Sequence, residues 1–364
     1  MTQQDPKKKL LLLTPDFPPR RGGVARYLSL LANKFSDQIT VIADLDSDWQ
    51  SFDPSATYPI FRMPLLYKFF WPRWWKTVRY LKSVKTQYDT FLISHVLPFG
   101  TAAMVANVPY ILFVHGMDIR LAGKSARKRR IAKRVMQKAR IVVTNSQALA
   151  DEISRDYGIG SLVVYPCVES VADQEFQPKA TGTTNLVSVS RLVERKGHTL
   201  VLNALAALRQ SGRLKNVHYD IVGTGPMYQT LKSMTHELGL DSIVKFHGDV
   251  SDAQLTGLYS SSDIFVLPVS NDPVDKEGFG LVFIEAATHA VPSITSDISG
   301  VNEAVINGET GILISPNDQD QLVNAIQLLL SKEEYRKQLG ESARDRVMHK
   351  FTCDDQFKKL EPYL

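Results

Sequence analysis

The residues most suited to chemistry in this sequence are two glutamates, Glu277 and Glu285, with seven residues between them. Gly278 and Gly280 follow the first glutamate, and glycine lets a backbone approach a ligand closely. The apolar run from Leu281 predicts a helix, whose first turn presents free N–H groups and the positive end of its dipole. Because carboxylates accept hydrogen bonds from hydroxyl groups, the pattern indicates a site for a polyhydroxylated, anionic ligand. The alternative is an ordinary helix with an acidic first turn and one glutamate on its buried side.

A basic motif, residues 190–197, follows the first predicted strand of the second half of the chain. Its Arg191 offers a two-pronged guanidinium and its Lys196 a mobile point charge, and both suit one diphosphate group. Gly223 and Gly225 follow the next strand and predict another turn that permits close approach. They do not form a G-x-G-x-x-G dinucleotide fingerprint, and basic residues are common in surface loops.

Two further motifs follow predicted strands in the first half. Gly22 and Gly23 precede a helix, so main-chain N–H groups there can face a phosphate. His115 and Asp118 can hydrogen-bond sugar hydroxyls or hold a developing charge. The alternatives are a plain turn for the glycines and a histidine that caps backbone groups. No second histidine or cysteine stands at metal-ligand spacing, so a bound metal is not indicated.

The two halves of the chain differ in charge. Residues 1–180 hold 26 Lys and Arg against 15 Asp and Glu, whereas residues 181–364 hold 17 against 23. The basic half predicts an anionic partner, which is a phospholipid surface, a polyanionic substrate or nucleic acid. No nucleic-acid-binding motif is recognisable, and the glycine turns favour small anionic ligands, so nucleic acid is not expected.

Much of the positive charge lies in two segments. Residues 60–85 hold seven Lys or Arg and eight aromatic residues, with no Asp or Glu; the aromatic residues include Trp71, Trp74 and Trp75. Amphipathic rings beside long cations suit the headgroup layer of a membrane, and charges this frequent exclude a spanning helix. A packed pair of aromatic helices is the alternative. Residues 124–140 hold nine Lys or Arg and predict a helix with one buried stripe and a cationic exposed face.

The length of 364 residues favours two domains. Short apolar runs alternate with helical patterns, which predicts an α/β protein with two Rossmann-like parallel-sheet domains facing a central cleft. The domains are expected at 1–168 and 185–345, with a hinge at 169–184 and a terminal helix, 346–364, crossing back to the first domain. The strands are expected at 9–14, 39–43, 90–94, 110–115, 141–145, 185–190, 218–222, 243–248, 264–268 and 292–295.

The N-terminus and the cysteines favour a cytoplasmic location. Residues 1–9 are polar and basic, and the apolar run at 10–13 is too short for a signal peptide or a membrane span. Cys167 and Cys353 are the only cysteines. They predict neither a disulfide framework nor a metal site and suit a reducing compartment.

Together, these motifs resemble glycosyltransferase family 4, the retaining nucleotide-sugar glycosyltransferases of the GT-B fold. The pattern is most similar to that of the bacterial phosphatidylinositol mannoside mannosyltransferases and related enzymes with lipid acceptors. The segments that occur in the order typical of the family are Asp16-Phe-Pro-Pro with Gly22 and Gly23, His115-Gly116, residues 190–197, residues 222–225 and residues 277–286.

The resemblance implies roles around the donor nucleotide. Arg191 and Lys196 would neutralise the donor diphosphate, and Gly22 and Gly23 would face its β-phosphate and the acceptor. Glu285 would hold the ribose hydroxyls.

It also implies roles around the transferred sugar. Glu277 and the backbone of 278–281 would grip that sugar, His115 would bind it near its C6 hydroxyl, and residues 248–250 would lie near the base. The implied catalytic residues are His115, Glu277, Arg191 and Lys196. The implied donor-binding residues are Gly22, Gly23, Arg191, Lys196, Gly223, Gly225, Val250, Glu277, Gly278, Phe279, Gly280, Leu281 and Glu285. Contacts to acceptor or membrane are expected from Arg20, Trp71, Trp74 and Trp75.

The sequence departs from the family pattern beside the donor pocket. His289-Ala290 stands where the family usually has Cys-Gly, and residues 299–302, Ser-Gly-Val-Asn, replace a Ser-Gly-Gly-x-Pro loop. These departures leave the identity of the sugar open.

The resemblance implies retaining transfer of a hexose, such as mannose or glucose, from a GDP- or UDP-sugar to a lipid-linked or phospholipid acceptor. The expected place is the cytoplasmic face of the cell membrane, with the protein bound peripherally to its anionic surface. The leaving phosphate would take the acceptor proton, and fixed positive charges would do the work of a metal, so no metal or other cofactor is expected. The alternatives are a non-catalytic nucleotide-sugar-binding regulatory protein and a sugar-nucleotide epimerase or phosphorylase of the same fold.

Overall fold

The computed structural model describes residues 8–45, 49–169, 182–272 and 275–364. The chain divides into two compact units, of which the first is Met1–Glu169 with Cys353–Leu364 and the second is Ser170–Thr352. Most of the expected hinge at 169–184 lies outside the described residues, as does the N-terminal stretch 1–7. No helix of the described ranges is long and apolar enough to cross a bilayer.

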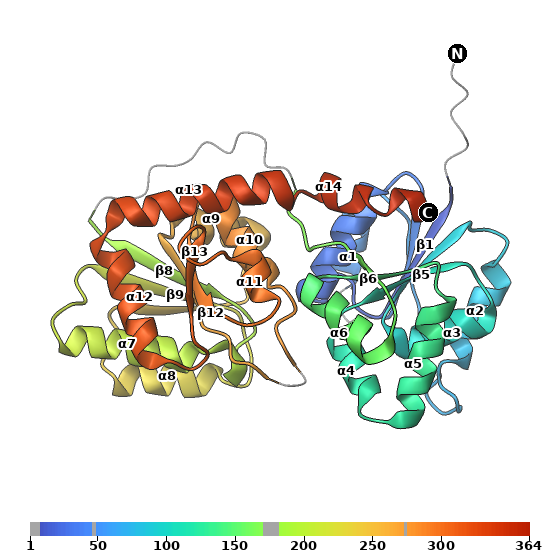
Figure 1. The fold of residues 1–364 in the computed structure, drawn as a ribbon, viewed down its shortest axis with the longest axis horizontal. Coiled ribbons are helices and arrows are strands. Elements are labelled where there is room, and N and C mark those ends of the chain that lie inside the picture. Colours follow the sequence, from blue (N-terminus) through green and yellow to red (C-terminus); the bar gives the residue numbers. More distant parts are fainter. Residues whose placement is uncertain (1–7, 46–48, 170–181, 273–274) are drawn as a thin grey trace, which may run out of the picture. The chain divides into compact units, whose positions relative to one another are not determined.

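The first unit is built on a seven-stranded parallel sheet in the order β3-β2-β1-β4-β5-β6-β7 (Figure 1). One face is covered by α1 and α14, and the other by α2 to α6. The strands are β1 Leu10–Thr14, β2 Ile39–Ala43, β3 Ile60–Arg62, β4 Thr90–Ser94, β5 Tyr110–Val114, β6 Ile141–Thr144 and β7 Leu162–Val163. The helices are α1 Gly23–Lys34, α2 Trp75–Val84, α3 Thr101–Ala106, α4 Met117–Gly123, α5 Ala126–Lys138, α6 Gln147–Tyr157 and α14 Cys353–Lys358.

The second unit has a six-stranded parallel sheet in the order β10-β9-β8-β11-β12-β13. Its main hydrophobic core joins the sheet to α7, α8, α12 and α13. The strands are β8 Thr184–Val189, β9 Val217–Val222, β10 Val244–Gly248, β11 Ile264–Leu267, β12 Ser293–Ser296 and β13 Gly311–Ile314. The helices are α7 His198–Gln210, α8 Tyr228–Glu237, α9 Asp252–Ser261, α10 Leu281–Thr288, α11 Val301–Ala304, α12 Gln319–Ser331 and α13 Glu333–Lys350.

All ten predicted strands are confirmed, each within one residue at either end. Central strands of a parallel sheet are buried on both faces, so they appear in a sequence as continuous apolar runs. In β1, for example, Leu11 and Leu13 lie in one core cluster while Leu10 and Leu12 lie in the other. The strands that were not expected, β3, β7 and β13, are at the edges of their sheets and are only partly buried, and their apolar runs are short.

The last helix packs on the first unit, and a disulfide holds it there. The rings of Tyr27 on α1 and Phe357 on α14 lie 5.6 Å apart. Cys353, the first residue of α14, is bonded to Cys167 and donates its backbone N–H to the carbonyl of Val168 at 3.0 Å. The expectation that the cysteines form no disulfide is therefore wrong. The cysteines lie 186 residues apart in the chain, and no spacing rule reveals a pair that only the tertiary fold brings together.

Breaking this disulfide is expected to destabilise the protein by about 2–5 kcal/mol, because the closed loop is long and the native end of the chain loses its tether. Thermal unfolding with and without a reductant measures the effect. The double variant Cys167→Ser with Cys353→Ser should unfold like the reduced wild type and should not respond to the reductant. Equal melting temperatures for oxidised and reduced wild type would contradict the prediction.

Candidate functional site

The carboxyl ends of the strands in the second unit carry a partly buried ion-pair cluster, which we call the Glu277 cluster. It comprises Glu277, Lys196, Arg195 and Asp275. The Oε2 atom of Glu277 accepts hydrogen bonds from Lys196 Nζ at 2.6 Å and from Arg195 Nη1 at 2.9 Å. The guanidinium of Arg195 also donates from Nε to Asp275 Oδ2 at 2.7 Å. Two cations thus bind one oxygen of this carboxylate.

Electrostatics fix the charge of this carboxylate. Burial opposes ionisation of Glu277, but the charges of Lys196 and Arg195 and their hydrogen bonds outweigh burial and lower its pKa to about 2. Glu277 is therefore an anion at neutral pH and acts as a hydrogen-bond acceptor.

The two predicted basic residues, Arg191 and Lys196, differ in burial. Lys196 lies within the cluster with 10% of its side chain exposed, whereas the side chain of Arg191 is 65% exposed and approaches Asp275 at 3.8 Å. Arg195, which was not expected to act, contacts both carboxylates of the cluster. Its place beside Lys196 in the basic motif was the only signal that pointed to it.

The predicted helix after Glu277 is confirmed as α10, with Gly280 as its N-cap. Gly280 has a φ of 85°, which an L side chain rarely adopts, so glycine is required where the chain turns into the helix. Glu285 on α10 accepts a hydrogen bond from the hydroxyl of Tyr259 at 3.2 Å. The ring of Phe279 is buried against Phe351, with centroids 5.2 Å apart, so its side chain belongs to the core.

Three other predicted donor-binding residues, Gly223, Gly225 and Val250, lie in the same unit. At Gly223 and Gly225 a Cβ atom would lie 2.0 Å from the carbonyl of Ser190 and 2.4 Å from that of Leu192, so this turn supports the basic loop by close packing. Val250 is half-buried and follows β10. His289, the departure from the family pattern, stacks on Tyr259, the residue that holds Glu285.

The carboxyl ends of β1, β4 and β5 in the first unit carry a second group, the histidine cluster. It comprises Asp16, Ser94, His95, His115 and Asp118. Ser94 Oγ lies 2.9 Å from His95 Nδ1 and 2.9 Å from His115 Nε2, and His95 Nε2 lies 3.3 Å from Asp16 Oδ2. Asp118 accepts the backbone N–H of His115 at 3.1 Å and that of Val96 at 2.9 Å. Asp118 thus joins the ends of β4 and β5, and the sequence singled out neither Ser94 nor His95.

His115 is neutral in this cluster. Burial lowers its pKa, the neighbouring His95 lowers it further, and Asp118 and Asp16 only partly oppose this, so that the pKa lies at about 4. Beside the cluster, Gly22 is the N-cap of α1, and a Cβ atom built on Gly22 or Gly23 would meet nothing within 4 Å. Arg20 donates to Asp16 at 3.0 Å.

The three predicted membrane tryptophans differ in exposure. Trp71 is 83% exposed and Trp75 is partly exposed, but Trp74 is half-buried and packs against the core. Phe69, which was not singled out, is 92% exposed, and Phe70 is also exposed. The predicted helix at 124–140 is confirmed as α5, with Ala132, Val135 and Met136 buried.

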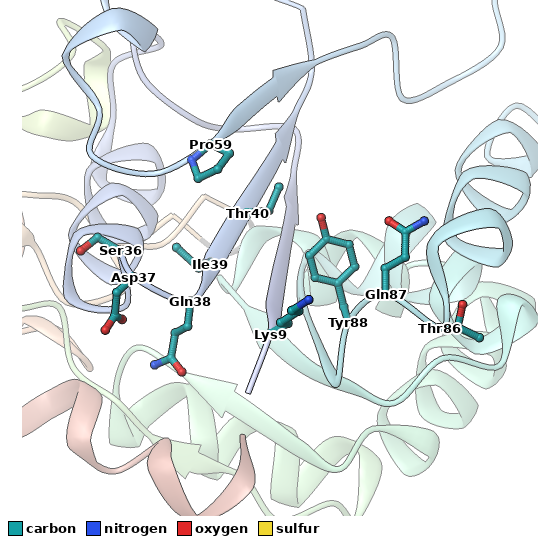
Figure 2. A pocket seen from close by; sticks show the side chains of 10 residues that line it. All are labelled: Lys9, Ser36, Asp37, Gln38, Ile39, Thr40, Pro59, Thr86, Gln87 and Tyr88. Atoms are coloured by element: carbon teal, nitrogen blue, oxygen red, sulfur yellow. The ribbon is translucent and has the colours of Figure 1, made fainter. Parts of the chain in front are cut away.

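A pocket of about 520 Å³ opens at the other end of the first sheet. Figure 2 shows Lys9, Gln38 and Tyr88 among its lining, beside the amino ends of β1, β2 and β4. Ligands of doubly wound folds bind beyond the carboxyl ends of the strands, so this pocket is not the candidate site. Within the described ranges no group of three or more His, Cys, Asp and Glu residues could hold a metal ion.

Comparison with known proteins identifies the family. The model "Glycosyltransferase Family 4" matches residues 21–172, and "Glycosyl transferases group 1" matches residues 169–346. The chain belongs to the glycosyltransferases. The second match contains the Glu277 cluster of this glycosyltransferase, and the first contains its histidine cluster except for Asp16.

Relatives and solved structures agree with this assignment. The chain is 26% identical to the GDP-mannose-dependent alpha-(1-6)-phosphatidylinositol monomannoside mannosyltransferase of Mycobacterium tuberculosis, over 98% of both chains. It is 26% identical to a GDP-mannose-dependent monoacylated alpha-(1-6)-phosphatidylinositol monomannoside mannosyltransferase of Corynebacterium glutamicum, over 97% of both. Its fold is similar to that of Anabaena Alr3699/HepE in complex with UDP and glucose, with a TM-score of 0.81, 20% identity and coverage of 98% and 99%. The predicted GT-B fold, with two Rossmann-like domains, is confirmed.

The pH dependence of stability tests the charge assigned to Glu277. Its pKa falls from 4.5 to about 2 on folding, so its ionisation stabilises the fold fully above about pH 4.5, and this contribution is lost as the pH falls towards 2. The contribution is about 3 kcal/mol. Denaturant unfolding of wild type and Glu277→Gln should differ most near neutral pH and less at about pH 3.5. Glu237→Gln, at an exposed position on α8, is the control. A difference independent of pH would show that Glu277 is not held as a low-pKa anion.

Proposed function

We propose that this glycosyltransferase transfers a hexose, mannose or glucose, from a GDP- or UDP-sugar to a lipid-linked or phospholipid acceptor with retention of configuration. The observation that carries the proposal is the Glu277 cluster beside the N-terminus of α10, where fixed cations and an ionised carboxylate meet. The names of the relatives, which specify GDP-mannose and a phosphatidylinositol mannoside, support this choice of donor and acceptor class.

The donor would be held by the second unit. Lys196, with Arg191 and Arg195, would neutralise the diphosphate, and the first-turn N–H groups of α10 would add the positive end of the helix dipole. Within the described part of the chain both hydrogen bonds to Glu277 go to Oε2, so Oε1 is the oxygen that a sugar hydroxyl would approach. Glu285, oriented by Tyr259, would accept hydrogen bonds from the ribose.

The chemical step would depend on fixed charge. The bond between the sugar and the β-phosphate would break through an oxocarbenium-like transition state, and the cations would stabilise the charge that develops on the leaving diphosphate. The same diphosphate would take the proton of the acceptor hydroxyl, which attacks from the side of the leaving group and so retains the configuration. With Lys196, Arg191 and Arg195 available, the reaction needs no metal. Neutral His115, in the first unit, would hydrogen-bond a hydroxyl of the sugar.

The acceptor side would rest on a lipid surface. The helices α2, α3 and α5 pack on the same face of the first sheet (Figure 1). Exposed Phe69, Phe70 and Trp71 precede α2, and the exposed side of α5 carries Lys and Arg. We define residues 68–74 as the aromatic loop. Together with α5 it offers apolar rings and cations, the combination that binds anionic headgroups. The cytoplasmic, peripheral location is proposed on the basis of this surface. The cysteines no longer support it, because they form a disulfide.

An acceptor-dependence assay tests the proposal. The purified protein is incubated with GDP- or UDP-sugars, with and without a phospholipid extract, and nucleotide release and the anomeric configuration of the glycolipid are measured. Release that requires the extract, with the donor's anomer retained, is expected. Donor binding without transfer would favour a regulatory protein, and conversion of the sugar nucleotide without acceptor would favour an epimerase.

A further inference from the structure

The histidine cluster contains a chain of polar contacts, two hydrogen bonds and one ion-pair contact, that the proposed reaction does not yet use. It runs from Asp16 Oδ2 to His95 Nε2 at 3.3 Å, from His95 Nδ1 to Ser94 Oγ at 2.9 Å, and from Ser94 Oγ to His115 Nε2 at 2.9 Å. The two imidazole rings lie 5.1 Å apart, centre to centre. Among the described residues, Ser94 is the one hydrogen-bond partner of the His115 ring, so Nδ1 of His115 can meet a ligand.

The backbone at His95 is strained, which indicates that the ring position matters. His95 has a φ of 75° and a ψ of 129°, a combination that residues with a Cβ atom rarely adopt. Asp118 holds this strand end by accepting the N–H of the next residue, Val96, at 2.9 Å. The fold thus maintains a costly conformation at a partly exposed histidine, and such strain concentrates at functional sites.

The serine hydroxyl links the proton positions of the two rings. Ser94 is fully buried and its side-chain partners are the two imidazole nitrogens, so its one proton goes to one nitrogen and its oxygen accepts from the other. When His95 is neutral, the nearby carboxylate of Asp16 favours its proton on Nε2. Ser94 then donates to His95 Nδ1, and His115 must carry its proton on Nε2. The Nδ1 atom of His115 is then an acceptor.

Protonation of His95 reverses this order. Imidazolium donates from both nitrogens, so Ser94 accepts from His95 and donates to His115 Nε2. His115 stays neutral and carries its single proton on Nδ1, which becomes a donor. In this change His95 gains one proton from the solvent. The proton of His115 exchanges from Nε2 to Nδ1, so the number of protons on His115 is unchanged.

We propose that His95 is a positioning residue for sugar transfer, which sets through Ser94 whether His115 presents an acceptor or a donor to the sugar. The inference rests on the proposed function, in which His115 meets the transferred sugar. A lone pair on Nδ1 stabilises the positive charge that develops on the sugar, whereas an N–H opposes it. Neutral His95 therefore gives the active form, and transfer falls at acidic pH when His95 gains a proton.

The charged groups around His95 come from four elements. Asp16, with Arg20 bonded to it, follows β1, and Ser94 precedes His95 on β4. His115 follows β5, and Asp118 lies in the first turn of α4. Of these groups Asp16 is the one that contacts the His95 ring with a charge.

Nitrogen NMR of histidine-labelled protein tests the proton linkage without any substrate. Spectra recorded across the titration of His95 report which ring nitrogen of His115 carries the proton, and His95→Gly and His115→Gln assign the signals among the eight histidines. The proton of His115 should move from Nε2 to Nδ1 as His95 becomes charged, and Ser94→Ala should abolish this response. The inference is overturned if the proton of His115 stays on the same nitrogen at every pH, or if Ser94→Ala shows the same response as wild type.

Kinetics test the consequence for transfer. Glycine tolerates the strained backbone of residue 95, so the relief of strain should offset the lost side-chain contacts and His95→Gly should fold. The variant should lower kcat/KM by about 10- to 100-fold, the effect of one lost interaction with a buried polar group. It should also remove the fall in transfer rate at acidic pH, which is the acidic limb of the pH profile. His236→Gln is the control, since this side chain is exposed on α8. An unchanged acidic limb in His95→Gly overturns the inference. Absence of transfer by the wild type would instead refute the proposed function, and the NMR result would still decide the linkage.

Discussion

Lys196→Ala is expected to lower the rate of sugar transfer by about 10²- to 10³-fold, the usual loss when one fixed donor to a developing negative charge is removed. In the structure Lys196 is nearly buried and its Nζ lies 2.6 Å from Glu277. Arg195 keeps its own hydrogen bond to Glu277, so the carboxylate remains paired in the variant and the fold should persist. Steady-state transfer with the best donor and acceptor measures the effect, and circular dichroism checks the fold.

Two further variants keep this prediction interpretable. Lys215→Ala removes an exposed lysine from the same unit and should leave transfer unchanged. Lys196→Ala with Glu277→Gln removes both partners, so any loss that stems only from an unbalanced carboxylate should be relieved in the double variant. Near-normal transfer by Lys196→Ala would remove this lysine from the proposed mechanism.

Removal of the exposed rings of the aromatic loop should have the next largest effect. Phe69→Ala with Trp71→Ala is expected to weaken binding to anionic liposomes by about 100-fold. Each ring that inserts fully moves its apolar surface out of water, which stabilises the bound state by on the order of 1.5–3 kcal/mol. Phe69 and Trp71 are the two most exposed large apolar side chains of the described residues. Sedimentation with liposomes of phosphatidylglycerol and phosphatidylcholine measures the partition coefficient.

The controls separate insertion from general loss of apolar surface. Phe61→Ala removes an exposed ring from the edge strand β3 and should change liposome binding much less. Activity on a soluble acceptor should be nearly the same in the loop variant and wild type. Binding should also weaken as salt rises, since α5 contributes by charge. Unchanged sedimentation of the loop variant would mean that this loop does not contact lipid.

The sequence revealed most of the architecture because the central strands are buried on both faces. It also identified Lys196, Glu277, Glu285 and His115, whose local motifs place glycine turns next to charged residues. The structure brings the first two into one cluster and places Glu285 on the helix that follows. Their roles as ligand-binding residues remain predictions.

Other features could not be predicted because they depend on contacts between distant segments. Ser94 and His95 end a strand without any motif of their own, and their partners come from residues 16 and 115. The Cys167–Cys353 disulfide needs the return of the chain to the first unit. The partial burial of Trp74 could not be predicted, because an aromatic residue between basic residues suits both a membrane surface and the edge of a core.

The most direct test of the donor site is a thermal-shift panel of GDP, UDP and ADP and their sugar conjugates on wild type and Lys196→Ala. A ligand that binds the folded state raises the melting temperature by mass action. The donor site at the Glu277 cluster predicts stabilisation of wild type by GDP or UDP and its sugar conjugate, and loss of that stabilisation in Lys196→Ala. Equal stabilisation of both proteins, or no stabilisation of wild type by any nucleotide, would contradict a nucleotide-sugar site at this cluster.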